Sequence, residues 1–246
     1  MAVTSPPTRR RVPWPVEFYR SAVGKKWVMA ITGILLLGFV LAHMIGNLKV
    51  FIGFLPEEAA YEIDLYGEAL RELLFPILPE YWVLWVIRVA LIVAFALHVH
   101  AAYALTIMNR RARQVDYQGP REYLVANYAS RTMRWTGVIV LLYLAWHLAD
   151  FTWNIQPFAP DGAVYGLIYE HFVLSFSRVP VSILYIVANL LLGIHIYHGA
   201  WSMFQSLGVN HPKFNPWRRY FAMAFAAVIV IGNVSFPVAV LTGLVS

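Results

Sequence analysis

Six of the eight histidines of this chain lie inside long apolar stretches, where an ionisable side chain is costly. The stretch WTGVIVLLYLAWHLADF, residues 135–151, places His147 in otherwise apolar sequence, with Asp150 one turn later. Such a histidine indicates either a functional site or a hydrogen bond to a neighbouring helix. The other five are His43, His98, His100, His195 and His198. His171 and His211 are expected in solvated loops.

The composition indicates a membrane protein. Of the 246 residues, 60% are hydrophobic and 13% are charged, whereas soluble domains carry about 45–50% apolar and about 25% charged residues. A helix needs about 20 apolar residues to cross the hydrocarbon core of a bilayer. Five segments meet this length: 27–48, 82–108, 135–155, 180–204 and 219–244. We therefore expect an all-α integral membrane protein whose residues 1–246 form a single transmembrane domain.

The distribution of charge predicts the orientation. The N-terminal segment and the loops 109–134 and 205–219 hold 15 of the 19 Lys and Arg residues, whereas the loops 49–81 and 150–178 hold 10 of the 13 acidic residues. Because basic segments mark the cytoplasmic side, the N-terminus is expected inside and the C-terminus outside. The basic surplus is then a topology signal, and no nucleic-acid binding is expected. Residues 56–80 have the leucine spacing of a short amphipathic helix on the outer surface.

This orientation sorts the histidines by depth. The first and third spans run outward and place His43 about 25 Å and His147 about 20 Å from the inner face, at 1.5 Å per residue. The second and fourth spans run inward and place His100 and His198 about 15 Å from that face. The four residues therefore form two pairs at two levels, and the first four helices form a histidine-bearing core with a fifth helix beside it.

Two facing histidine pairs are typical of iron porphyrin sites, because the iron takes one axial imidazole from each side. Helical bundles build such sites from side chains on facing helices. The chain has no cysteine, which excludes a covalently attached c-type haem and leaves haem b, held by ligation and packing. Two haems b at two levels would form an electron path across the membrane.

The choice of inner ligands is not settled by helix geometry. His98 and His100 are two residues apart and point to different sides of a helix, so only one of them faces the bundle centre. His195 and His198 are three apart and share a face, so either one fits. The histidine left over on each span is expected to hydrogen-bond a carbonyl group or a haem propionate.

An internal repeat favours one choice. TGILLLGFVLAH ends at His43 and TGVIVLLYLAWH ends at His147, with Thr-Gly at the same offset, and HAAYAL from His100 matches HGAWSM from His198. The repeat pairs His43 with His147 and His100 with His198, and it leaves the other two histidines as neighbours of the cofactors. The small residues beside these ligands leave room for a macrocycle close to the backbone.

These motifs resemble the cytochrome b membrane-anchor subunit of succinate dehydrogenase or fumarate reductase (respiratory complex II), in its single-chain, five-helix, two-haem class. The resemblance covers the chain from about Arg20 to Phe236. It rests on Thr-Gly ten residues before the histidine in the first and third spans, on HAAYA in the second and on HGAWSMFQ in the fourth.

The resemblance implies that His43 and His147 bind the haem distal to the soluble subunits, and that His100 and His198 bind the proximal one. It implies a cytoplasmic iron–sulfur subunit that carries a flavoprotein, where succinate is oxidised. Electrons would then pass through the haems to menaquinone in the bacterial inner (plasma) membrane, which links the tricarboxylic acid cycle to the respiratory chain.

The quinone and propionate sites are expected from location alone. Family members often hold propionates with a polar pair before the first Thr-Gly, but Met29 and Ala30 stand here, and Ser21, Arg20, Lys25 or Lys26 would have to substitute. Candidates for a quinone site at the outer end are Arg88, Asp150, Trp146 and Glu80. Candidates at the inner end are Ser21, Arg20 and Trp201.

Three alternatives remain open on the sequence. The chain could be the cytochrome b subunit of a membrane hydrogenase, formate dehydrogenase or nitrate reductase. It could be a haem-free anchor whose histidines complete an iron–sulfur cluster with cysteines from a partner chain. A transporter with histidine proton relays is disfavoured, because such proteins need a polar path at mid-membrane and these spans carry almost no other charge there.

Overall fold

The protein is built from five long apolar helices, as the sequence predicts for an all-α integral membrane protein. The computed structural model describes residues 12–112 and 128–246, without the side chains of 128–131. Each predicted span corresponds to one helix that is long and apolar enough to cross a membrane. These helices are α2 (Ala22–Asn47), α4 (Trp82–Arg111), α5 (Tyr128–His147), α7 (Val179–Ser206) and α8 (Asn215–Leu241).

The first span begins earlier than predicted, at a sharp corner with the short helix α1 (Trp14–Arg20). The Ser21 side chain caps α2 by accepting a hydrogen bond from the Gly24 amide, at 2.9 Å. Buried Lys25 donates to the carbonyl oxygens of Tyr19 and Arg20, at 2.7 and 3.1 Å. Two of the four residues expected to replace the propionate-binding pair are therefore engaged in the corner itself.

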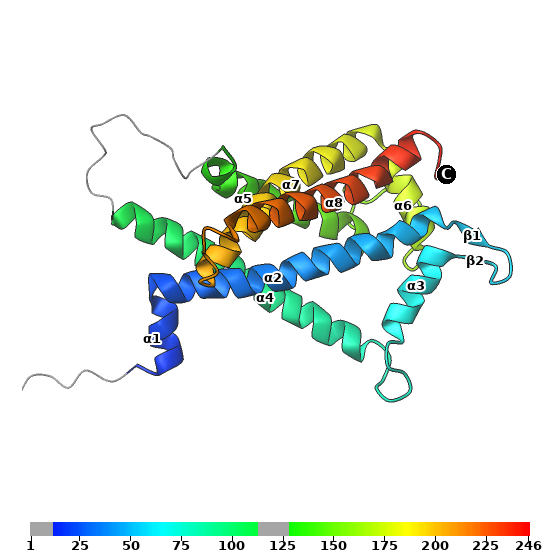
Figure 1. Cartoon of the computed structure of the whole chain (residues 1–246). Coiled ribbons are helices and arrows are strands. Elements are labelled where there is room, and N and C mark those ends of the chain that lie inside the picture. Colours follow the sequence, from blue (N-terminus) through cyan, green and yellow to red (C-terminus); the bar gives the residue numbers. More distant parts are fainter. Residues whose placement is uncertain (1–11, 113–127) are drawn as a thin grey trace, which may run out of the picture.

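Helix α2 packs against α4, α7 and α8, and α4 crosses it obliquely (Figure 1). Helix α7 packs along both α5 and α8. The fifth span is an integral part of the bundle, because small residues let it approach closely. A Cβ atom on Gly193 would lie 2.3 Å from Val230, and one on Gly232 would lie 2.0 Å from the sulfur of Met44.

Helix α4 has a different environment from the other spans. It buries only Ala94, Ala101 and Leu105. Its neighbours are α2, along which it packs, and the surface helix α3 (Glu62–Arg71). Of its two histidines, His98 is positioned by α2 and His100 by Tyr19 of α1.

One end of the bundle, called the outer end here after the orientation predicted from charge, is covered by short elements that the sequence predicts only in part. The predicted amphipathic helix within 56–80 is confirmed as α3. The turn η1 (Leu48–Phe51) and a two-stranded antiparallel hairpin, β1 (Phe54–Leu55) and β2 (Ala60–Tyr61), precede it. The predicted loop 150–178 instead contains a second surface helix, α6 (Ile168–Ser177). These elements lie at the end of the bundle opposite α1 (Figure 1).

The two surface helices are joined by a cap. The Asp64 carboxylate of α3 accepts hydrogen bonds from the amides of Ile168 and Tyr169, at 2.6 and 3.0 Å, at the start of α6. A carboxylate at this end accepts hydrogen bonds from amides that have no partner in the helix, and its charge interacts favourably with the helix dipole. Such a cap stabilises a helix by about 1 kcal/mol. The rings of Tyr61 and Tyr169 stack at 3.6 Å, and burial raises the pKa of Tyr169. The elements that cover this end of the bundle are therefore joined to one another by specific contacts.

Candidate functional site

The outer histidine pair is brought together by α2 and α5. The rings of His43 and His147 face each other with centroids 5.9 Å apart and planes at 85°. An imidazole nitrogen binds a metal ion at about 2 Å, so two rings on opposite sides of one ion have centroids roughly 6 Å apart. The observed spacing matches this arrangement, so the pair fits the two axial positions of one iron.

Aromatic rings surround this pair. Phe39 stacks on His43 at 5.3 Å, one turn earlier on α2. On the other side, Tyr143 and Phe151 flank His147, at 6.0 and 5.6 Å between centroids. Gly38 precedes Phe39 in α2, and a Cβ atom at this glycine would meet nothing within 4 Å. Aromatic rings therefore flank both histidines, while His43 and Gly38 are exposed residues of α2.

His98 of α4 also lies against α2, farther from the outer end of the bundle than His43. The Nδ1 atom of His98 is 3.1 Å from the carbonyl oxygen of Met29 and 3.2 Å from the hydroxyl of Thr32. A Cβ atom on Gly33 would lie 3.5 Å from the same ring. The absence of a side chain at this glycine therefore lets the imidazole approach the α2 backbone.

The same arrangement recurs between α5 and α7. The Nδ1 atom of His195 is 3.4 Å from the hydroxyl of Thr136, which itself donates to the carbonyl oxygen of Met133 at 3.0 Å. A Cβ atom on Gly137 would lie 3.4 Å from this ring. The Met-x-x-Thr-Gly motif occurs at both places, so the repeat in the sequence is also a repeat in structure.

The expected hydrogen bond to a carbonyl group is confirmed for His98. Because a carbonyl oxygen only accepts, Nδ1 of His98 carries the proton; the Thr136 hydroxyl donates to Met133, so it accepts from Nδ1–H of His195. In both rings the Nε2 lone pair is left free. Metal-binding histidines usually donate their second nitrogen in this way, which fixes the ring and its tautomer. Because each ring is held in the same way against a Thr-Gly pair of the preceding span, His98 and His195 form a second candidate pair. Within residues 12–112 and 128–246, no ring contact or hydrogen bond joins these two histidines directly.

The pair suggested by the sequence repeat, His100 and His198, is arranged differently. His100 is exposed, and its Nδ1 hydrogen-bonds the hydroxyl of Tyr19 on α1. His198 packs edge-on against Trp201, and its buried Nδ1 has no hydrogen-bond partner. Within residues 12–112 and 128–246, no ring contact, hydrogen bond or ion pair joins these two histidines.

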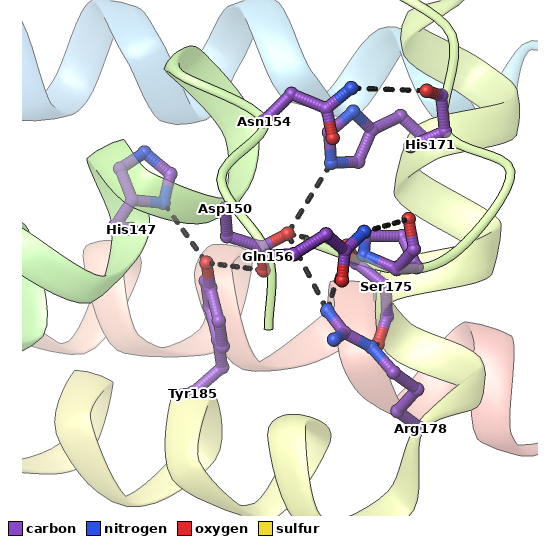
Figure 2. Close-up of polar contacts among 10 residues, drawn as sticks. His147, Asp150, Asn154, Gln156, His171, Ser175, Arg178 and Tyr185 are labelled. Atoms are coloured by element: carbon purple, nitrogen blue, oxygen red, sulfur yellow. Dashed lines mark hydrogen bonds and ion pairs between the residues drawn. The ribbon is translucent and has the colours of Figure 1, made fainter. Parts of the chain in front are cut away.

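A buried carboxylate lies next to the outer pair (Figure 2). The chain after His147 forms a π-helical turn, Leu148–Thr152, in which Asp150 is fully buried. Such turns often occur at functional sites. Four side chains hydrogen-bond or ion-pair with the Asp150 carboxylate: Ser175 at 2.8 Å, Tyr185 at 3.2 Å, His171 at 3.3 Å and Arg178 at 3.5 Å. The carboxylate is thus neutralised and hydrogen-bonded, as a buried charge requires.

The expectation for His171 is wrong. The sequence predicts a solvated loop there, but His171 is 7% exposed and lies in α6, with its ring stacked on Phe151 at 5.0 Å between centroids. The reason is tertiary: the ten-residue helix α6 folds back over the outer end of the bundle and faces Asp150. His211 does lie on the exposed surface, as expected.

The structure does not gather the outer quinone candidates around one place. Arg88 and Glu80 are exposed, and the Arg88 guanidinium lies over the ring of Trp85 rather than beside Asp150. Trp146 packs edge-on against Phe158, and its buried indole N–H has no hydrogen-bond partner.

The inner candidates are also separate. Ser21 is engaged as a helix cap, Arg20 is exposed and Trp201 packs against His198. The sequence does not predict the residues that contact Asp150. The polar residues inside the apolar stretch 168–189 are a signal that could have pointed to them.

The donor set fits a macrocycle better than a bare metal ion. In the part of the chain that the structure describes, no three His, Asp or Glu side chains form a metal-binding group. Two imidazoles supply only the axial positions, and a porphyrin supplies the other four ligands of an iron.

Comparisons with protein-family models, curated proteins and solved structures found no match for this chain.

Proposed function

We propose that this chain is the membrane-anchor cytochrome b subunit of a succinate:quinone oxidoreductase of the complex II type. The observation that carries the proposal is the facing pair His43 and His147, with a second histidine pair placed deeper in the same bundle. Five spans with imidazoles on four of them are what a two-haem electron path requires.

For the inner haem we propose His98 and His195 as the axial ligands. Nδ1 of His98 is held by the Met29 carbonyl and Thr32, Nδ1 of His195 is held by Thr136, and both rings keep Nε2 free for the iron. The alternative pair, His100 and His198, lacks this matched support. His100 is directed instead to Tyr19 at the corner between α1 and α2.

When bound, haem b supplies a one-electron carrier at each level. The chain would contribute the ligands, hold their tautomers and exclude water from the rings by packing apolar side chains around them. The basic inner segments would dock an iron–sulfur subunit, which carries a flavoprotein that oxidises succinate. Menaquinone in the bilayer would receive the electrons, and the host membrane would be a bacterial plasma membrane.

Purification of the complex from its native membrane distinguishes this function from other membrane oxidoreductases. We expect a tagged chain to bring down one iron–sulfur and one flavin-containing subunit, and to reduce a menaquinone analogue when succinate is added. Association with a nickel- or molybdenum-containing subunit would instead favour a hydrogenase, formate dehydrogenase or nitrate reductase. A complex with bound iron and sulfide but no haem would favour the haem-free anchor.

A further inference from the structure

We infer that Tyr185 and Asp150 are positioning residues for the outer haem, which orient His147 and increase its electron donation to the iron. This inference rests on the proposed haem-binding function. It assigns a role to a buried carboxylate and a tyrosine that neither bind the cofactor directly nor serve only as packing.

The direction of the hydrogen bonds follows from their chemistry. A carboxylate only accepts, so the Tyr185 hydroxyl donates its proton to Oδ2 of Asp150, at 3.2 Å. The hydroxyl oxygen then accepts from Nδ1–H of His147, at 3.4 Å (Figure 2). His147 is therefore held in the tautomer whose Nε2 lone pair is free, with a carboxylate at the other end of the chain of hydrogen bonds.

The surroundings hold this chain of hydrogen bonds in place. Tyr185 is 3% exposed and packs edge-on against Phe151 and Phe176, at 6.0 and 5.0 Å between ring centroids. Ser175 and Arg178 occupy the other side of the Asp150 carboxylate. Tyr185 therefore has one well-defined position relative to His147, and its hydroxyl lies in a low-dielectric region where hydrogen bonds are electrostatically stronger.

The outer pair is asymmetric as a result. Within the described ranges, no hydrogen bond reaches the ring nitrogens of His43, whose ring contacts are Phe39 and His147. A hydrogen bond that leads to a carboxylate makes an imidazole a stronger donor. A stronger axial donor stabilises the oxidised iron and lowers the reduction potential of the haem. We therefore attribute the lowering of the outer haem's reduction potential to His147 and its hydrogen bond to Tyr185.

The test is a redox titration of the Tyr185→Phe complex, followed by the haem absorbance bands. At the potential where the wild-type outer haem is half reduced, we expect a reduced-to-oxidised ratio about tenfold higher in the variant, which is about 59 mV for a one-electron couple. The inner haem titrates as in wild type, because its ligands make no contact with Tyr185.

Tyr143→Phe is the matched control. Tyr143 lies on α5 beside the same histidine, but its hydroxyl bonds Asn189 at 3.3 Å. A shift confined to Tyr185→Phe supports the inference. An unchanged potential in Tyr185→Phe, or an equal shift in both variants, would overturn it.

A second variant keeps the test decisive if Tyr185→Phe loses the outer haem. Asp150→Asn preserves the shape of the side chain but removes its charge, and it should raise the outer potential in the same direction. An outer haem with wild-type potential in that variant would refute the inference. Wild-type complex without any haem would refute the proposed function itself, so the two failures are distinguishable.

Discussion

Replacing His147 by alanine should remove the outer haem and leave the inner one, so that the purified complex holds one haem b per chain instead of two. Among the residues that the structure describes, His147 is the one imidazole in ring contact with His43, with centroids 5.9 Å apart. A haem that loses one of its two axial ligands also loses a large part of its binding energy. Pyridine haemochrome content per chain measures this loss directly.

His211→Ala is the matched control for this substitution. His211 is exposed, and its Nδ1 only accepts a hydrogen bond from the Lys213 amide, at 3.2 Å. This variant should keep both haems. If His147→Ala also keeps both, with unchanged spectra, the pairing of His43 with His147 is wrong.

The second large effect concerns the inner haem. His98→Ala and His195→Ala should each reduce the haem content from two to one per chain, and the haem that remains should have the potential of the outer haem. His100→Ala should keep both haems, because that side chain is exposed and directed to Tyr19. Reduced-minus-oxidised spectra together with a redox titration identify which haem is lost.

This series also decides between the two inner pairings. Loss of the inner haem in His100→Ala and His198→Ala, with retention in His98→Ala, would support the pairing that the sequence repeat predicts. The opposite pattern would support the pairing proposed from the structure. His98 and its neighbour His100 share one helix, so they provide controls for each other.

Sequence patterns predicted the spans well, because apolar runs of membrane-crossing length leave few alternatives. They also identified the outer pair, since depth and the Thr-Gly repeat pointed to His43 and His147. For the inner pair the repeat predicts His100 and His198, whereas we propose His98 and His195 from the packing of the helices. Thr32-Gly33 and Thr136-Gly137 precede histidines on their own helices, but they pack against His98 and His195 on the following helices. A one-dimensional repeat does not show such contacts between helices.

The Asp150 cluster lay beyond sequence reasoning for a related reason. Its members come from the π-helical turn, from α6 and from α7, and they meet only because α6 folds over the outer end of the bundle. The segment of α6 is too short to span a membrane and has loop-like flanks, so His171 was expected in solvent. Burial of His171 and Ser175 depends on tertiary packing, not on local pattern.

The haem content of the wild-type complex, purified from its native membrane, tests the central claim most directly. The account predicts two haems b per chain by pyridine haemochrome, with two resolved potentials in a redox titration. A complex without haem, or with a single haem that survives His147→Ala, would contradict it.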